Sequence, residues 1–229
     1  MSIAENFAQV RQQVAEAARR SGRAPEDITI VAVSKTVGLE QVEEAIAAGV
    51  TDFGENRPDQ LMEKHDAFPE VRWHFIGNIQ SRRIKDIVGR ATLVHSLDRV
   101  EHLERFEQRA AAAGIVVPLL IEVNVSGEAS KSGFTPAEVA SVLDGFGNYP
   151  HLRAHGLMTM APQGMPDAIR RSFSGLRELR DALRPRFGGN VSLDELSMGM
   201  SEDFAVGIEE GATIVRIGRS IFSEGFISV

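Results

Sequence analysis

Residues 28–54 read ITIVAVSKTVGLEQVEEAIAAGVTDFG, and this stretch decides the fold. An apolar, β-branched run at residues 28–33 is followed by a turn and then by residues 39–48, whose apolar positions recur at helical spacing. A second β-rich run follows at residues 51–54. Continuous runs of valine and isoleucine are typical of parallel strands that are covered on both faces. The stretch therefore predicts a strand–helix–strand unit.

The same alternation continues through the rest of the chain. We expect eight β segments, at residues 28–33, 51–54, 71–76, 92–95, 116–125, 152–158, 193–196 and 213–217. Sequence of helical period follows them, and we expect helices at residues 39–48, 56–65, 79–88, 98–113, 136–146, 165–183 and 202–210. A further helix, at residues 3–21, precedes the first strand, and a short turn or helix ends the chain. Gly22 is the expected cap of the first helix, and Asp98 is the expected N-cap of the helix that it opens.

Eight β–α units in 229 residues predict an α/β protein with a single (β/α)8 TIM-type barrel and an extra N-terminal helix. We expect one domain over residues 1–229. A doubly wound open sheet is the alternative, but it normally has fewer strands and carries the glycine pattern GxGxxG after its first strand. Here the first turn reads SKTVG, at residues 34–38, which favours the barrel.

The composition excludes several classes of protein. Hydrophobic residues make up 43% of the chain, which is too many for extensive disorder, and the net charge of −7 argues against a nucleic-acid-coating role. The absence of cysteine excludes disulfides and thiolate metal sites. The first twenty residues are charged throughout and no window resembles a membrane helix, so we expect a cytoplasmic protein with no membrane partner.

Lys35 is the first candidate for chemistry. The active site of a TIM-type barrel lies at the carboxyl ends of its strands, and Lys35 follows the first strand. A lysine that an apolar strand partly desolvates has a lowered pKa, and its neutral amine can form a Schiff base with a carbonyl. The alternative is a surface lysine whose stem lies on the rim.

The loops after the seventh and eighth strands predict an anion site, because barrels frequently bind phosphate there. Gly199 and Gly218 let backbone amides approach an anion. Three side chains of these loops add donors: Ser201, Arg219 and Ser220. We expect Glu202 and Asp203 in the first turn of the following helix. The alternative is that both glycines serve only the turns.

Arg216 lies within an otherwise apolar strand, TIVRIG at residues 213–218. A buried guanidinium needs acceptors, because leaving it unpaired is costly. Either Arg216 pairs with a strand carboxylate such as Glu122 or Glu195, or it faces the barrel mouth and donates to a ligand. The residues alone leave both interpretations open.

Other patterns are less informative. No metal motif, Walker A loop or GxSxG elbow occurs, so we expect no metal site. His151 and His155 are four residues apart, but they begin an expected strand and need not share a face. We expect Glu128 and Lys131 to form an ordinary loop ion pair or to be solvated surface groups. We expect a solvated helix face in the basic run Arg82, Arg83 and Lys85, which could alternatively attract an anionic partner.

Seven motifs identify a family. They are VAVSKT around Lys35, FGEN ending at Asn56, WHFIGNIQ from Trp73, VNVSGEASKSGF from Val123, HGLMTMAP from His155, LSMGMSEDF from Leu196 and GATIVRIGRSIF from Gly211. Together they resemble the pyridoxal 5′-phosphate (PLP) homeostasis protein family, single-domain relatives of the alanine racemase barrel. The resemblance covers almost the whole chain.

The resemblance implies PLP as the cofactor and assigns roles to individual residues. Lys35 would hold PLP as a Schiff base, Arg216 would face the pyridine nitrogen, and Asn56 would line the pocket. The phosphate would be bound, largely by backbone amides, at Met200, Ser201, Gly218 and Arg219. The sequence departs from the family pattern at Arg57 (often Tyr), Arg82 and Arg83 (often Asn-Lys), Glu122 (often Gln), Arg219 (often Thr or Ser) and Ser223 (often Gly).

The same comparison distinguishes a carrier from a catalyst. An arginine beside the pyridine nitrogen keeps that nitrogen unprotonated and makes the ring a poorer electron sink. Alanine racemase also takes a second base, a tyrosine, from a second domain, whereas here the only tyrosine, Tyr149, precedes the sixth strand at the opposite end of the barrel. We therefore expect PLP binding without efficient catalysis.

The resemblance further implies a role in PLP (vitamin B6) homeostasis, in which the protein buffers the cofactor or delivers it to PLP-dependent apo-enzymes. We expect a monomer that binds no nucleic acid. One alternative is a PLP-dependent racemase-type enzyme. Another is an aldolase whose Lys35 attacks a phosphorylated sugar without a cofactor.

Overall fold

The computed structural model describes residues 1–128 and 131–223, and in them strands alternate with helices from end to end. The strands are β1 (Thr29–Val33), β2 (Asp52–Glu55), β3 (Arg72–Phe75), β4 (Leu93–Leu97), β5 (Val117–Glu122), β6 (Leu152–Met158), β7 (Val191–Ser197) and β8 (Ile214–Ile217). The α-helices are α1 (Ile3–Arg20), α2 (Leu39–Ala47), α3 (Pro58–Ala67), α4 (Ile84–Ile87), α5 (Glu101–Ala113), α6 (Pro136–Gly145), α7 (Pro166–Leu183), α8 (Phe204–Glu209) and α9 (Arg219–Phe222). Short 3₁₀ turns occur at Pro25–Asp27, Ser81–Arg83, Phe146–Asn148 and Arg184–Arg186.

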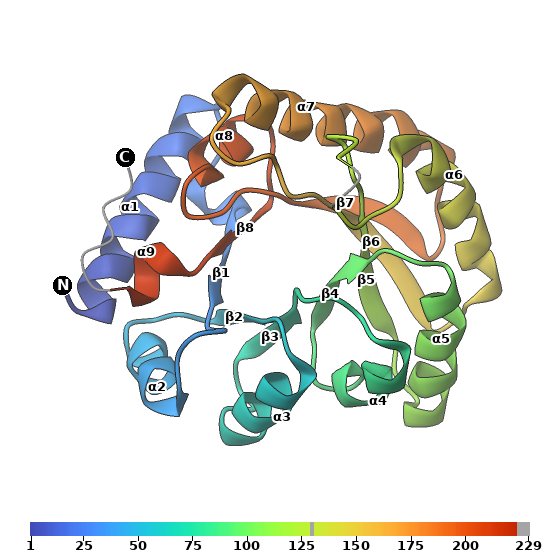
Figure 1. Cartoon of the computed structure of the whole chain (residues 1–229), viewed down its shortest axis with the longest axis horizontal. Helices are drawn as coiled ribbons and strands as arrows, with labels where there is room; N and C mark the ends of the chain where they lie inside the picture. The colour runs from blue at the N-terminus through green and yellow to red at the C-terminus, as the bar shows by residue number, and fades with distance from the viewer. Residues whose placement is uncertain (129–130, 224–229) are drawn as a thin grey trace.

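The strands form a closed ring in chain order, and the helices lie outside it (Figure 1). Every strand pairs in parallel with its neighbours, and β1 closes the ring against β8, with Thr29 opposite Ile214 and Ala32 opposite Ile217. This confirms the predicted (β/α)8 barrel and its N-terminal helix. The open-sheet alternative is wrong.

Side chains alternate between the inside of the ring and the layer under the helices, as the period of a strand requires. The outer layer is the main core, and its largest fully buried side chains include Phe53, Trp73 and Phe75. A smaller apolar cluster fills part of the interior: Val31, Leu93, Leu120, Met158 and Ile214. Buried polar side chains, among them His95, Ser197 and Arg216, also lie in the interior.

Two predicted helix starts are wrong by a few residues. The helix expected at residues 56–65 begins at Pro58, because proline is well suited to the first helical position. The helix expected at 98–113 begins at Glu101, and Val100 rather than Asp98 occupies the N-cap position. The Asp98 carboxylate instead lies 3.5 Å from His102 Nδ1.

Two further segments are shorter than predicted. Of residues 79–88, only Ile84–Ile87 is α-helical, after a 3₁₀ turn. The helix expected at 202–210 begins at Phe204, so Glu202 and Asp203 lie before its first turn. The short helix expected at the end of the chain is α9.

The N-terminal helix α1 is fixed at both ends. Ser2 and Glu5 form a capping box at its start, and Asn6 Nδ2 donates to Ile221 O in α9 at 3.0 Å. Gly22 follows the helix with a φ of +71°, so it adopts the left-handed conformation that ends many helices. None of the helices in the described residues is long and apolar enough to cross a membrane.

Candidate functional site

A cavity of about 330 Å³ opens at the carboxyl ends of the strands. It is lined by Val33, Lys35, Asn56, Ile76, Met160, Gln163, Met200, Ser201, Arg216, Gly218 and Arg219. All seven residues that the family resemblance assigns to the site are among them, although they follow or belong to strands as distant in the chain as β1 and β8. Met160 and Gln163, from the loop after β6, are additions that the sequence did not single out.

Lys35 is more exposed than predicted. It lies two residues beyond the end of β1, and its side chain is exposed rather than partly desolvated by the strand. Within the described chain no hydrogen bond or ion pair engages its amine. The amine is therefore available to a ligand in the cavity.

The backbone just before Lys35 rests on a buried ionic group. Lys64 Nζ, from α3, donates to Ser34 O at 2.7 Å and to Glu55 Oε1 at 2.5 Å. Ser34 Oγ donates to the same carboxylate oxygen at 2.6 Å. The sequence analysis missed this group, and the available signal was weak: a lysine among the buried positions of a helix, nine residues after a strand glutamate.

The loops after β7 and β8 both reach the cavity, and contacts within the first loop fix its shape. Gly199 has a φ of +98°, and a Cβ there would lie 2.8 Å from Phe204 Cα, so glycine is required by both conformation and space. Asp203 Oδ1 accepts from Met200 N at 2.6 Å and holds the loop in place. In the described part of the chain, no acceptor is bonded to the backbone N–H of Ser201 or of Gly218.

Arg216 is buried and faces the cavity. Its Nη1 donates to Ser197 O at 2.9 Å and to Ser197 Oγ at 2.6 Å, and its Nη2 donates to Thr159 O at 3.2 Å. Burial lowers the pKa of Arg216 to about 10, and the charges of Glu122 and Asp203 oppose that shift. The guanidinium nevertheless remains charged at neutral pH.

The two interpretations of Arg216 are thereby separated. Among the described residues, neither Glu122 nor Glu195 lies within 4.0 Å of the guanidinium, and Glu195 accepts from Thr213 Oγ1 instead. Arg216 lines the mouth cavity, as the ligand interpretation predicts. Carbonyl and hydroxyl oxygens of Ser197 and Thr159 accept three hydrogen bonds from it.

Two other lining residues bear on ligand binding. Asn56 Oδ1 is buried and has no hydrogen-bond partner in the described residues, which is costly unless a ligand supplies a donor. Arg219 is exposed and pairs with Glu202 at 2.8 Å. The guanidinium of Arg219 therefore already forms an ion pair with the Glu202 carboxylate, while Arg219 also lines the cavity.

The remaining sequence candidates lie elsewhere. His151 pairs with Glu107 at 2.7 Å, and Lys131 pairs with Glu128 at 3.0 Å, as an ordinary loop ion pair. In the basic run, Arg83 pairs with Asp86, whereas Arg82 and Lys85 are exposed. Tyr149 precedes β6 at the amino end of the barrel, and the described residues hold no cluster of three potential metal ligands.

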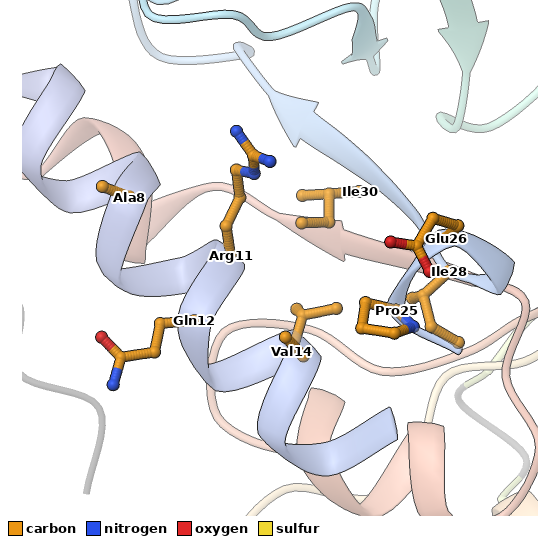
Figure 2. A pocket seen from close by; sticks show the side chains of 9 residues that line it. Ala8, Arg11, Gln12, Val14, Pro25, Glu26, Ile28 and Ile30 are labelled. Atoms are coloured by element: carbon orange, nitrogen blue, oxygen red, sulfur yellow. The ribbon is translucent and has the colours of Figure 1, made fainter. Parts of the chain in front are cut away.

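A larger cavity, about 530 Å³, lies outside the ring between α1 and the segment that leads into β1 (Figure 2). Figure 2 shows side chains of α1, among them Arg11 and Val14, on one side and Pro25, Ile28 and Ile30 on the other. None of the residues predicted for the functional site lines this larger cavity. Size alone therefore does not identify the functional cavity, whereas converging polar groups do.

Comparison with known proteins shows the family of this chain. The family model for the alanine racemase N-terminal domain matches residues 3–224. A pyridoxal phosphate homeostasis protein of Aquifex aeolicus is 40% identical over 227 residues, which cover 98% of this chain and 99% of that protein. The chain belongs to the pyridoxal phosphate homeostasis protein family. A second member, from Pseudomonas aeruginosa, is 41% identical over 224 residues, which cover 96% of this chain and 95% of that protein.

Solved structures place this family member among similar barrels. PipY of Synechococcus elongatus, a structure with PLP bound, superposes with a TM-score of 0.85 at 30% identity, covering 97% of this chain and 100% of that one. Alanine racemase from Streptomyces coelicolor has a TM-score of 0.73 at 19% identity, covering 97% of this chain but only 58% of the racemase. The second likeness concerns the fold alone.

Proposed function

We propose that this protein binds PLP covalently through Lys35 in the mouth cavity and acts in PLP homeostasis as a carrier without efficient turnover. The observation that carries the proposal is the convergence of an unengaged lysine amine, a buried arginine and two glycine loops on one cavity. Its volume of about 330 Å³ lies within the range of small-ligand sites. The PLP-bound relative PipY supports the same assignment.

The groups in the cavity fit the cofactor. The aldehyde of PLP supplies an electrophilic carbon, which condenses with a primary amine and releases one water. Lys35 offers that amine. The backbone N–H groups of Ser201 and Gly218, which have no acceptor among the described residues, suit a phosphate, with Met200 and Arg219 beside them. Arg216 would face the pyridine nitrogen, and the unpaired Asn56 Oδ1 would accept a hydrogen bond from the ligand or its water.

The same residues argue for a carrier. A charged guanidinium beside the ring nitrogen disfavours a second positive charge there, which weakens the ring as an electron sink. Tyr149, the only tyrosine, precedes β6 at the other end of the barrel, so it supplies no second base at the mouth. We propose one PLP-binding domain over residues 1–229, acting as a monomer that passes PLP to apo-enzymes.

The test is a covalent map of the cofactor. Purified protein is incubated with PLP, its visible absorbance is recorded, and borohydride reduction is followed by peptide mass mapping. We expect an adduct on Lys35 and none in Lys35→Ala, which should fold normally because the side chain is exposed. Lys85→Ala, another exposed lysine, is the matched control and should keep the adduct.

The outcomes are distinct. A protein that acquires no adduct and no visible absorbance would overturn PLP binding. Rapid conversion of D- or L-amino acids by the loaded protein would replace the carrier by a racemase-type enzyme. Transfer of PLP to an apo-enzyme faster than free PLP is released would support delivery.

A further inference from the structure

The barrel interior contains a continuous chain of hydrogen bonds that ends at Arg216. His74 Nε2 lies 3.1 Å from Asp52 Oδ1, and His74 Nδ1 lies 2.9 Å from His95 Nε2. His95 Nδ1 lies 2.8 Å from Ser197 Oγ, which accepts from Arg216 Nη1 at 2.6 Å. We call Asp52, His74, His95 and Ser197 the interior chain. All four are buried.

The interior chain connects two ends of the barrel. Its residues belong to β2, β3, β4 and β7, and the bond between His95 and Ser197 crosses the ring, because β5 and β6 lie between β4 and β7. Asp52 and His74 line a cavity of about 390 Å³ that also includes Arg72 and Pro118, near the starts of β3 and β5. Arg216 lines the mouth cavity at the opposite end. The interior chain, together with Arg216, is therefore a polar path between the two cavities.

With both histidines neutral, the two ends of this path determine the direction of every hydrogen bond in it. A guanidinium only donates, so Ser197 Oγ accepts from Arg216 and has its own proton to give to His95 Nδ1. His95 then carries its proton on Nε2 and donates to His74 Nδ1. His74 carries its proton on Nε2 and donates to Asp52, an ionised carboxylate that also accepts from Arg72 at 2.7 and 2.6 Å.

Charge and burial support this order. Burial lowers the pKa of His95 well below its usual value, and the charge of Arg216 adds to this lowering. Burial alone would raise the pKa of Asp52, but hydrogen bonds from His74, Arg72 and Thr51 outweigh it and lower that pKa overall. A neutral His95 and an ionised Asp52 are the states that the proton order requires.

We propose that the interior chain positions the Arg216 side chain toward the mouth cavity, with Ser197 and His95 as its positioning residues for the bound ligand. This inference rests on the proposed function, because the ligand in question is PLP. Among residues 1–128 and 131–223, Ser197 supplies two of the three acceptors of Arg216, and His95 orients the hydroxyl among them. Loss of that hydroxyl frees the guanidinium to turn without removing its charge.

The first test compares Ser197→Ala with Ser197→Thr, which restores a hydroxyl. We expect Ser197→Ala to weaken PLP binding about tenfold and to change the visible absorbance of the Lys35-linked cofactor. Ser197→Thr should restore both. Ser172→Ala, which removes a buried serine hydroxyl bonded to Ala168 O in α7, is the matched control and should leave both unchanged.

A second measurement needs no cofactor. Nitrogen-15 NMR of the PLP-free protein should show His95 neutral, with its proton on Nε2. A proton on Nδ1 of His95, or Ser197→Ala with the affinity and absorbance of the wild type, would overturn the inference. Wild-type protein that binds no PLP would instead overturn the proposed function, and the tautomer of His95 would still decide the proton order.

Discussion

Glu55 and Lys64 form an ion pair in the layer beneath the loop that carries Lys35. Their side chains are 0% and 3% exposed, and removing one partner from such a pair costs about 3–5 kcal/mol because the other charge is left buried. Lys64 also donates to the backbone of Ser34. The pair therefore fixes the backbone immediately before the exposed side chain of Lys35.

A second buried carboxyl group, Glu122, should make stability depend on pH. Burial and the charge of Asp98 raise its pKa to about 7, against the opposing charge of Arg216. A raised pKa means that the folded protein keeps a proton that the unfolded chain has lost, so the free energy of unfolding falls as pH rises from about 4.5 to about 7. The loss that this one group contributes is about 3 kcal/mol.

The variant that tests this is Glu122→Gln. The glutamine amide does not ionise, so the free energy of unfolding of the variant should not fall between about pH 4.5 and about pH 7 on account of this position. The variant should therefore be more stable than the wild type at pH 8. Urea unfolding of both proteins at pH 4.5, 6, 7 and 8 measures the difference. Parallel profiles would show that Glu122 stays ionised in the folded state.

At the scale of the element, the carboxyl ends of β2 and β3 approach so closely that glycine is required. A Cβ on Gly77 would lie 1.9 Å from the carbonyl oxygen of Asn56, so alanine must displace the loop that places Asn56 in the cavity. We expect Gly77→Ala to lower stability by about 1–3 kcal/mol and to weaken PLP binding. Thermal unfolding and a PLP titration measure the two effects.

Gly147→Ala is the control, because a Cβ there meets nothing within 4 Å and φ is not positive. It should bind PLP as the wild type does. If Gly77→Ala also kept wild-type affinity, the placement of Asn56 would not matter to the ligand.

The strands were predictable because each is a short apolar run, and β6 begins and ends where the sequence places it. Helix starts were less predictable, since Pro58 and Val100 determine them through backbone geometry that hydrophobic period does not report. Five of the seven site residues were found because strand ends of a barrel meet at one face, whereas Asn56 and Met200 were found through the family resemblance. Their roles rest on the family resemblance and remain proposals.

What the sequence could not reveal are contacts between distant positions. His95 and Ser197 are 102 residues apart, and nothing near either of them indicates a hydrogen bond across the ring. The exposure of Lys35 was equally hidden, because it depends on how far beyond β1 the chain turns. The hydrophobic period of a strand or helix predicts which face a side chain lies on, but not which other side chain it contacts there.

At the scale of the whole molecule, the ends of the chain complete the ring. β1 pairs with β8, Asn6 bonds to Ile221, and Arg20 of α1 pairs with Glu209 of α8 at 3.2 Å. A closed ring has no free strand edge, and every strand depends on both neighbours. Residues from both halves of the chain line the mouth cavity, so a ligand there is bound only by the complete ring.

PLP should therefore stabilise the entire barrel as one unit. A ligand that binds only the folded state, at a free concentration 100 times its Kd, raises the free energy of unfolding by about 2.7 kcal/mol. Urea unfolding with and without PLP should show one transition, displaced as a whole to higher urea. Lys35→Ala replaces an exposed side chain, so without PLP its free energy of unfolding should lie within about 0.5 kcal/mol of the wild-type value. Added PLP should raise the free energy of unfolding of this variant only slightly. A transition that splits, with PLP displacing only one part, would mean that the site belongs to a smaller folding unit than the ring.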